Sequence, residues 1–540
     1  MNGLVRRAAL GLACALPLSA CSNGDVEAPR HVLFLVCDTL RADHLSAWGH
    51  ERETSPHIDS LAARGVRFSR AVSQCSWTAP SMISLMTGRY LADPRLKIPA
   101  DVTTLAEIFQ AGGYATHAFL SNPLLMEQYG FYRGFDQAQR LEPYAPDDPI
   151  VAWIESQKDA RTFTYVHLNE PHDPYQPPPD WRNWGNDPPP LDAERLALYE
   201  RLAPEQVNKE VLAEIRRGVG GYDDDVRYTD RRIGLFLDAL ERTGQLEDTA
   251  IVMTADHGEG LWTRFDFASN GPRASRRKNG EAPTLTTTFK MTHGNYVYTE
   301  QVHVPIVLTF PGLGEAARGR VIASRVENID VVPTLLELCD LGDPGGLQGT
   351  SLLRAMEDQA AWRENKKYIY TATRFVCSVI TQDGWQLMLP TDLGECREGL
   401  IVELYDLGSD PEARRNVAAE HPERVQELTA VCNARRASGI AATDEEPASP
   451  EDEQRRQNAL RDLGYVGNGT ADSLINNLTG EATAALLEIL EDRKLDCVDR
   501  MFAARALATR ELTEAQGVRL DAVLEAETSP GVLRPFGGAR

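Results

Sequence analysis

Two carboxylates and a histidine follow apolar runs in the sequence, where a buried strand would deliver them to a site. Asp38 closes the run His31 to Cys37, and Asp256 and His257 follow the run Thr249 to Thr254. Carboxylates and a neutral imidazole are ligands for a divalent metal ion, and the neighbouring glycines let the backbone approach it. A histidine ligand suits zinc or manganese, whereas a set richer in oxygen suits calcium. Asp38 alone has a structural alternative, since an Asp at this position can cap a helix.

Thr78 lies where a turn gives way to an apolar helical pattern, in the segment Ser76-Trp-Thr-Ala-Pro-Ser-Met82. Proline suits the first turn of a helix, so Thr78 stands at a helix N-terminus, where free amides and the helix dipole favour an anion. The alternative is that Thr78 or Ser76 merely caps the helix.

Two further histidines, His172 and His293, lie in polar segments of the chain. The pKa of imidazole suits proton transfer near neutral pH. Single histidines are often packed or solvated, so these two gain significance only from the other segments.

The fold must bring the ends of several strands together. Apolar runs that become polar only at their carboxyl ends are typical of strands buried on both faces of a parallel sheet. The strand-like runs are 31–37, 162–168, 249–254 and 304–310, and the helix-like stretches between and after them are 57–64, 103–111, 223–242 and 330–339. This alternation predicts an α/β/α sandwich around a large, mostly parallel (mixed) sheet, with the site beyond the carboxyl ends of the strands.

Composition divides the chain into a large domain and smaller pieces. The expected order is a signal peptide over 1–20, a tether over 21–30, a catalytic domain over 31–357, an α+β subdomain over 358–437, a linker over 438–469 and a helical tail over 470–540. The linker is acidic and contains proline. Residues 262–291 read as a polar insertion, and the tail carries no chemistry that we can identify.

The N-terminus predicts export. Two arginines precede an apolar stretch that is too short to span a membrane, and Leu18-Ser-Ala-Cys21 follows it. That segment resembles the bacterial lipobox, which implies lipidation of Cys21 and anchoring to a membrane of the cell envelope, at the periplasmic face or the cell surface. An ordinary secretory signal with an incidental cysteine is the alternative.

The formal net charge of −23 argues against nucleic acid as a partner. An anionic substrate therefore needs a local positive site, which a bound metal would supply. Seven cysteines follow Cys21 without a CxxC pair or a zinc pattern. Export permits disulfides among them, and the odd number leaves at least one thiol free or paired between chains.

Taken in order, these motifs resemble the sulfatase family of the alkaline phosphatase superfamily over roughly residues 31–420. The main matching segments are Asp38, Thr78-x-Pro80-Ser81, Pro171-His-Asp-Pro-Tyr175, Asp256-His-Gly-Glu259 and His293-Gly294. Secondary matches are Thr54 to Asp59, Ser121-Asn122, Gly134 to Asp136, Asp330 to Thr334 and Glu403 to Pro411. The resemblance implies an alkaline-phosphatase-like fold.

One segment departs from the family pattern. Sulfatases carry Cys-x-Pro-x-Arg, whose cysteine becomes formylglycine, whereas this chain has Thr78 at the cysteine position and Met82 at the arginine position. We therefore expect no formylglycine. Threonine here resembles the phosphodiesterases and the phosphoethanolamine or phosphoglycerol transferases of the superfamily, in which a divalent cation can activate the hydroxyl as a nucleophile.

The resemblance also assigns roles to individual residues. One divalent metal ion (zinc, manganese or calcium) would be held by Asp38, Thr78, Asp256 and His257, with Thr78 as the nucleophile. His172 or His293 would protonate the leaving oxygen. Asn122 and Arg41 would bind non-bridging oxygens of the substrate or orient Asp38.

The expected function is metal-dependent hydrolysis of an anionic ester, namely a sulfate, phosphate or phosphonate ester of a glycan, a lipid headgroup or a small molecule. One alternative is an envelope transferase, although such relatives usually carry transmembrane helices beside the catalytic domain. Another is a non-catalytic protein that binds an anion or glycan, which the loss of arginine at Met82 motivates.

Overall fold

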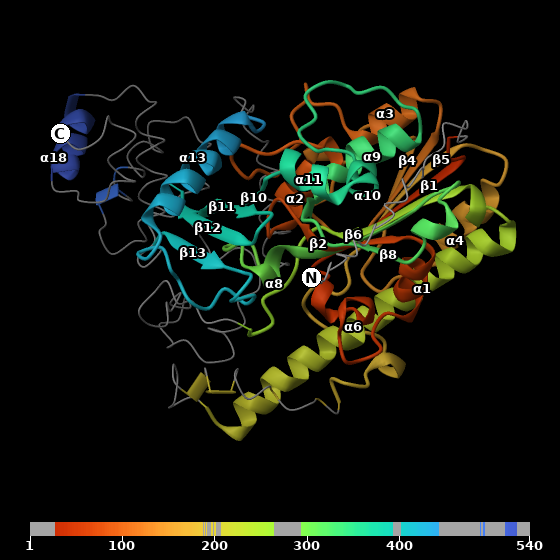
Figure 1. Cartoon of the computed structure of the whole chain (residues 1–540), viewed down its shortest axis with the longest axis horizontal. Helices are drawn as coiled ribbons and strands as arrows, with labels where there is room; N and C mark the ends of the chain where they lie inside the picture. Colours follow the sequence, from red (N-terminus) through yellow and green to blue (C-terminus); the bar gives the residue numbers. More distant parts are fainter. Residues whose placement is uncertain are drawn as a thin grey trace, which may run out of the picture.

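The computed structural model of the chain describes residues 28–186, 207–263, 293–391, 401–441 and 514–525, with single residues and pairs between 188 and 200 and between 487 and 491 (Figure 1). The predicted signal peptide and Cys21 lie outside these residues. So do most of the tether, most of the 262–291 insertion and most of the linker. Of the tail, the structure gives one longer helix, α18 (Glu514–Glu525).

A large mixed sheet forms the centre of the molecule, in the order β4-β3-β5-β1-β6-β7-β2-β8, with β9 pairing with β2. Its strands are β1 (His31–Cys37), β2 (Val66–Val72), β3 (Ala115–Leu120), β4 (Gln137–Arg140), β5 (Thr162–Leu168), β6 (Thr249–Ala255), β7 (His303–Thr309), β8 (Arg320–Ile322) and β9 (Val326–Glu327). Only the β2–β7 and β6–β7 pairs are antiparallel. Every residue of β1, β5 and β6 is buried, as the continuous apolar runs predict.

Helices cover both faces of this sheet, which confirms the sandwich (Figure 1). One layer contains α1 (Pro56–Arg64), α4 (Asp148–Ser156) and α6 (Lys209–Thr243), and the other contains α2 (Thr78–Thr87), α3 (Leu105–Ala111), α9 (Val331–Leu338), α10 (Leu352–Glu357) and α11 (Gln359–Asn365). The short helix α8 (Thr299–Val302) precedes β7. Among the residues that the structure describes, none of the helices combines the length and apolarity needed to cross a bilayer.

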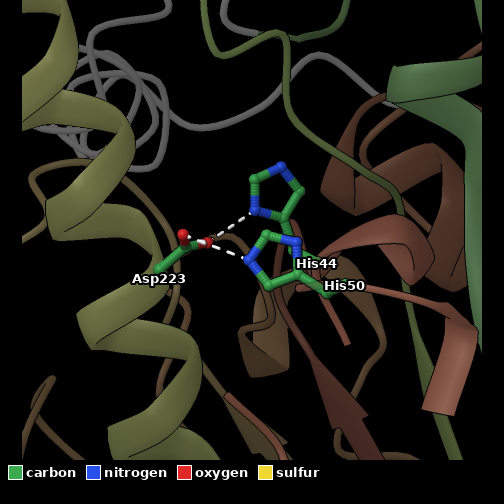
Figure 2. A group of neighbouring side chains, drawn as sticks. All are labelled: His44, His50 and Asp223. Atoms are coloured by element: carbon green, nitrogen blue, oxygen red, sulfur yellow. Dashed lines mark hydrogen bonds and ion pairs between the residues drawn. The ribbon is translucent and has the colours of Figure 1, made fainter. Parts of the chain in front are cut away.

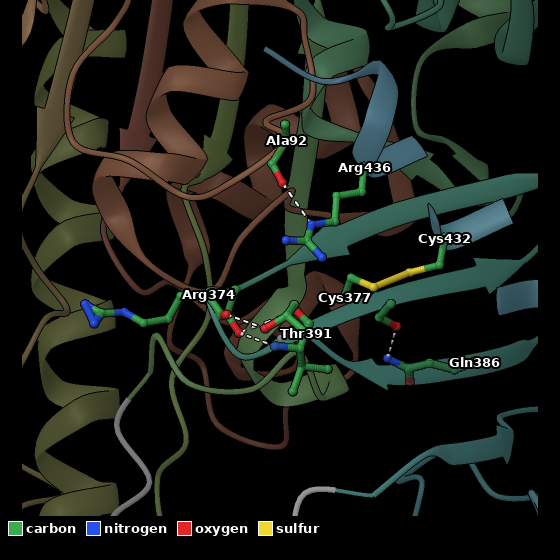
Figure 3. Close-up of a disulfide and its surroundings, with 10 residues drawn as sticks. Ala92, Arg374, Cys377, Gln386, Thr391, Cys432 and Arg436 are labelled. Atoms are coloured by element: carbon green, nitrogen blue, oxygen red, sulfur yellow. Dashed lines mark hydrogen bonds between the residues drawn. A yellow bond between two sulfur atoms is a disulfide. The ribbon is translucent and has the colours of Figure 1, made fainter. Parts of the chain in front are cut away.

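A second, antiparallel sheet follows in the C-terminal region, in the order β10-β11-β12-β13. Its strands are β10 (Tyr368–Ala372), β11 (Val376–Thr381), β12 (Trp385–Pro390) and β13 (Glu403–Asp406). Helix α13 (Pro422–Ser438) packs against it, and the disulfide Cys377–Cys432 joins β11 to that helix (Figure 3). Arg436 of α13 donates a hydrogen bond to the carbonyl of Ala92, which ties this α+β unit to the main domain (Figure 3).

Candidate active site

The central site forms where two neighbouring parallel strands end. The register of β1 and β6 pairs Cys37 with Ala255, so the next residues, Asp38 and Asp256, emerge side by side at one edge of the sheet. Thr78 begins helix α2 close to them, and its side chain is fully buried, as are both carboxylates. The sheet therefore brings together three residues that lie far apart in the sequence.

The ring of His257 directs the lone pair of its Nε2 toward these residues. Its Nδ1 lies 2.8 Å from the carbonyl oxygen of Gly258, which can only accept, so Nδ1 carries the proton of the neutral ring. The other nitrogen, Nε2, lies 3.4 Å from Asp256 Oδ2, 3.8 Å from Asp38 Oδ1 and 3.2 Å from Thr78 Oγ1. Four possible ligand atoms therefore surround one small volume.

The remaining carboxylate oxygens are used for positioning. Asn122 Nδ2 donates to Asp38 Oδ2 over 2.5 Å, and the amides of Thr39 and His257 donate to Asp256 Oδ1 over 3.1 and 2.7 Å. Asp38 Oδ1 and Asp256 Oδ2 are buried and have no hydrogen-bond partner within the described residues. The two unpartnered oxygens are the two that face His257 Nε2.

The buried charges of the site would be stabilised by a bound cation. Burial raises the pKa of Asp38 well above its usual range, and the neighbouring charge of Asp256 raises it further. Burial also lowers the pKa of His257, which keeps its ring neutral. Two carboxylates and a neutral imidazole balance a divalent ion and suit a transition metal, so the residues present fit the metal that the sequence predicts.

Arg41 and Asn122 make different contacts near the site. Asn122 orients Asp38 through the hydrogen bond above. The guanidinium of Arg41 is engaged by both carboxylate oxygens of Asp43, at 2.9 and 2.6 Å, and by the carbonyl of Glu259 at 3.1 Å. These contacts hold the loop after β1. Contact between either side chain and a substrate stays a prediction.

The structure places both candidate acids next to the metal ligands. The His293 ring centroid lies 4.6 Å from that of His257 and 5.0 Å from that of His172. Burial lowers the pKa of His172, whose Nδ1 donates to the carbonyl of Asp173 over 2.7 Å. The two histidines therefore lie together beside His257, and their role as acids stays a prediction.

Glu259 also lies in the candidate site, although the sequence singles it out only as part of the Asp256 to Glu259 motif. Its side chain is fully buried, and its carboxylate oxygens lie 3.3 and 3.2 Å from Nδ1 of His293. Tyr175 lies close enough to Glu259 to feel its charge, and burial raises the pKa of Glu259. The adjacency of an acidic residue to the Asp-His pair was the available signal, but nothing in the sequence linked it to His293.

A second His/Asp cluster lies in the loop region that follows β1 (Figure 2). His44 Nδ1 lies 2.6 Å and His50 Nε2 3.3 Å from the two oxygens of Asp223, which is almost fully buried. Arg52 also donates to Asp223. Because a guanidinium already balances the charge of this carboxylate, the Asp38, Asp256 and His257 set is the better candidate for a metal site.

Two positions bear on the formylglycine motif. Met82 is fully buried in the hydrophobic core, and the hydroxyl of Tyr165 lies 3.8 Å from its sulfur. Cys75 is buried and carries a free thiol. Burial raises the pKa of the Cys75 thiol to about 12, so it remains protonated at neutral pH.

Comparisons with known proteins agree with this geometry. The family model described as Sulfatase matches residues 30–341, and the model for the C-terminal region of N-sulphoglucosamine sulphohydrolase matches residues 289–435. The ulvan-active sulfatase of Formosa agariphila is 25% identical over 381 residues, covering 63% of this chain and 68% of that protein. The N-acetylglucosamine-6-O-sulfatase of Bacteroides thetaiotaomicron is 22% identical over 522 residues, covering 77% and 88%.

Solved structures extend the likeness of fold. The phosphonate monoester hydrolase of Agrobacterium radiobacter is similar with a TM-score of 0.59 at 20% identity, over 76% of this chain and 96% of that one. This likeness confirms the alkaline-phosphatase-like fold. Because the Sulfatase model spans more than half of the sequence, the chain belongs to the sulfatase family of the alkaline phosphatase superfamily and is an ester hydrolase.

Proposed function

We propose that this chain hydrolyses a sulfate, phosphate or phosphonate ester with Thr78 as a metal-activated nucleophile. The observation that carries the proposal is the convergence of Thr78 Oγ1 and His257 Nε2, 3.2 Å apart, with the unpartnered oxygens of Asp38 and Asp256. A hydroxyl placed among metal ligands is the arrangement that makes a weak nucleophile reactive.

Asp38, Asp256, His257 and Thr78 would hold the metal, with zinc or manganese favoured by the histidine. When bound, such an ion supplies Lewis acidity, which lowers the pKa of the threonine hydroxyl and neutralises negative charge on the group that is transferred. Asn122 keeps Asp38 in place for this role, since it binds the carboxylate oxygen that faces away from His257.

The proposed reaction has two steps. In the first, Thr78 Oγ1 loses its proton to water and forms a bond to sulfur or phosphorus while the bond to the alcohol oxygen breaks. His293 or His172 gives a proton to the departing oxygen. In the second, water cleaves the threonine ester, which releases the inorganic anion or phosphonate and restores the hydroxyl.

His293 is the better placed acid of the two. Its Nδ1 lies against the buried carboxylate of Glu259, and its ring centroid lies 4.6 Å from that of His257. A carboxylate on one ring nitrogen also stabilises the protonated ring that an acid requires. Burial lowers the pKa of His172, which favours its neutral ring even though Nδ1 is hydrogen-bonded to the carbonyl of Asp173.

The names of two relatives support a proposal for the substrate class. Those named above act on ulvan and on N-acetylglucosamine 6-O-sulfate, as their names state. We propose a sulfated glycan as the preferred substrate, with phosphate and phosphonate esters as the alternative that Thr78 favours, since threonine replaces the formylglycine precursor.

The experiment is an ester panel on the mature protein. Bound metal is measured first, and turnover of matched aryl sulfate, phosphate monoester, phosphodiester and phosphonate esters is then compared with and without a chelator. We expect turnover of at least one ester that chelation abolishes and added metal restores. No turnover of any ester by a protein with bound metal would contradict the proposal and favour the binding-protein alternative.

We further propose that the chain is exported and anchored to the envelope through lipidated Cys21. The disulfide Cys377–Cys432 supports an oxidising compartment. Mass spectrometry of the mature N-terminal peptide should find a lipid on Cys21, and Cys21→Ala should release the protein from the membrane fraction. An unmodified N-terminus at any other residue would contradict this part.

A further inference from the structure

Two tryptophans and three arginines form one surface beside α6, which we call the tryptophan–arginine surface. The guanidinium carbons of Arg52 and Arg227 lie 5.4 and 5.8 Å from the ring centroid of Trp184, and that of Arg231 lies 5.8 Å from the ring centroid of Trp181. All five side chains are partly exposed. Arg227 and Arg231 are one helical turn apart and share a face of α6.

The backbone around Trp184 is held firmly against α6. The amides of Trp184 and Gly185 donate to the buried carboxylate of Asp224 over 2.9 and 2.8 Å. A Cβ at Gly220 would lie 2.2 Å from the carbonyl oxygen of Trp184, so only glycine permits this contact. Glycine weakens a helix interior, and here it allows the loop to pack directly on the helix.

The same turn of α6 connects this surface to the active site. A Cβ at Gly221 would lie 3.3 Å from Cβ of Tyr175, whose ring packs edge-on against Tyr222 at 5.4 Å. Tyr175 also lies near the carboxylate of Glu259, which contacts His293. The tryptophan–arginine surface therefore lies on the outer side of the loop whose inner end contacts the reacting residues.

The surface carries positive charge on a strongly acidic protein, whose net charge is −23. Within the described part of the chain, no carboxylate forms an ion pair with Arg227 or Arg231. Asp223 is contacted by His44 and His50 (Figure 2). Arg52 is also paired with Asp223, and this pair helps to hold the Arg52 guanidinium over the Trp184 ring.

We propose that the tryptophan–arginine surface binds a sulfated glycan chain at sugars beyond the one whose ester is cleaved. Arg52 and Arg227 each use an N–H donor within the protein, on Asp223 and on the carbonyl of Glu53. A guanidinium carries further in-plane N–H donors, which suit the oxygens of a sulfate. Tryptophan rings offer flat apolar area to the C–H faces of sugars. This inference rests on the proposed function for its substrate class, and it assigns the surface to polymer binding and not to catalysis.

The test separates binding from turnover. Binding of dextran sulfate and of unsulfated dextran is measured for the wild type, for Arg227→Gln/Arg231→Gln and for the matched control Arg217→Gln/Arg242→Gln, which removes two other arginines of α6. We expect the first pair to weaken binding of dextran sulfate by about tenfold or more, as for two charge-assisted contacts, and the control pair to have little effect. Turnover of a small aryl ester should be the same in all three proteins.

A second measurement needs no variant. Hydrogen exchange of the segment 179–186 should slow when dextran sulfate is added to the wild type and should not change with dextran. Equal loss of binding in both arginine pairs, or unchanged binding and exchange, would overturn the proposal. Binding that follows these expectations without turnover of any ester would contradict the proposed hydrolysis and leave the glycan-binding surface standing.

Discussion

At the scale of single residues, the convergence of ligand atoms on His257 Nε2 makes a sharp prediction. Asp256→Asn removes the charge and one of the two unpartnered oxygens, so we expect bound metal to fall from about one per chain to almost none. The loss of affinity should exceed the roughly 10–100-fold effect of an outer-shell change. Metal analysis after dialysis measures it.

The control for that measurement lies in the other histidine cluster. His50→Ala removes one histidine of the cluster around Asp223. Because Arg52 already balances the charge of Asp223, we expect no metal there, so this variant should keep its metal and its turnover. If His50→Ala lost its metal and Asp256→Asn kept it, the metal would lie at the Asp223 cluster and the prediction would be wrong.

Glu259 gives a second prediction at this scale, because its carboxylate holds Nδ1 of His293. Glu259→Gln should slow hydrolysis of an alkyl ester by about 10–100-fold, since a poor leaving group needs the acid. An activated aryl ester, whose alcohol leaves without a proton, should lose far less. An equal loss on both esters would show that Glu259 supports the fold and not the acid.

At the scale of elements, Tyr222 links α6 to the loop that carries the metal ligands. Its hydroxyl donates to the carbonyl of Thr39 over 2.7 Å and accepts from the amide of Arg41 over 2.9 Å, both buried. Tyr222→Phe leaves these backbone groups unpaired, so the free energy of unfolding should fall by about 1–3 kcal/mol. Urea denaturation checks this value.

Tyr228→Phe is the matched control on the same helix. Within the described residues, the Tyr228 hydroxyl makes no hydrogen bond, so this change should stay within about 0.5 kcal/mol of the wild type. A loss of similar size in both variants would mean that the Tyr222 hydroxyl does not stabilise the loop.

The sequence predicted the placement of some elements and not of others. Strands β1 and β6 were predictable because apolar runs ended in polar residues, and parallel pairing then brings Asp38 and Asp256 together. The first half of α6, from Lys209, was not predicted as helix, because it is polar and contains glycines. Those glycines are needed because Trp184 and Tyr175 pack directly against the helix, and no local sequence pattern reveals such tertiary contacts.

The candidate site was predictable to a similar extent. Ligand types at strand ends pointed to Asp38, Asp256 and His257, and the turn before an apolar helix pointed to Thr78. The pairing of Glu259 with His293 was not predictable, since 34 positions separate them and only the fold brings them into contact. The same holds for Asp223, whose partners His44 and His50 precede it by 179 and 173 positions.

At the scale of the whole molecule, buried neutral histidines should make stability depend on pH. Burial lowers the pKa of His117 to about 4, and no partner among the described residues binds its ring nitrogens. The unfolded chain takes up a proton near the ordinary pKa of about 6.5, so stability is full above that pH and is lost as the pH falls toward 4. His31 and His167, with pKa values also lowered to about 4, add to this loss.

His117→Leu isolates one share of this effect. His117 stacks on Phe119 at 4.2 Å and meets the Trp153 ring at 4.4 Å, so leucine suits its surroundings. Between pH 6.5 and 4 the variant should lose less stability than the wild type, by up to about 1.4 kcal/mol per pH unit. Urea titrations of both proteins at several pH values measure this difference. If the two proteins lost stability equally as the pH fell, the prediction would be wrong.

The most direct test of the central claim compares the wild type with Thr78→Ala and Thr78→Ser, each loaded with metal and assayed on the ester that the wild type prefers. We expect Thr78→Ala to lose turnover by roughly a thousandfold or more while still binding metal, and Thr78→Ser, which keeps a hydroxyl, to retain much of the turnover. Full metal-dependent turnover by Thr78→Ala would contradict the account, because another group would then attack the ester.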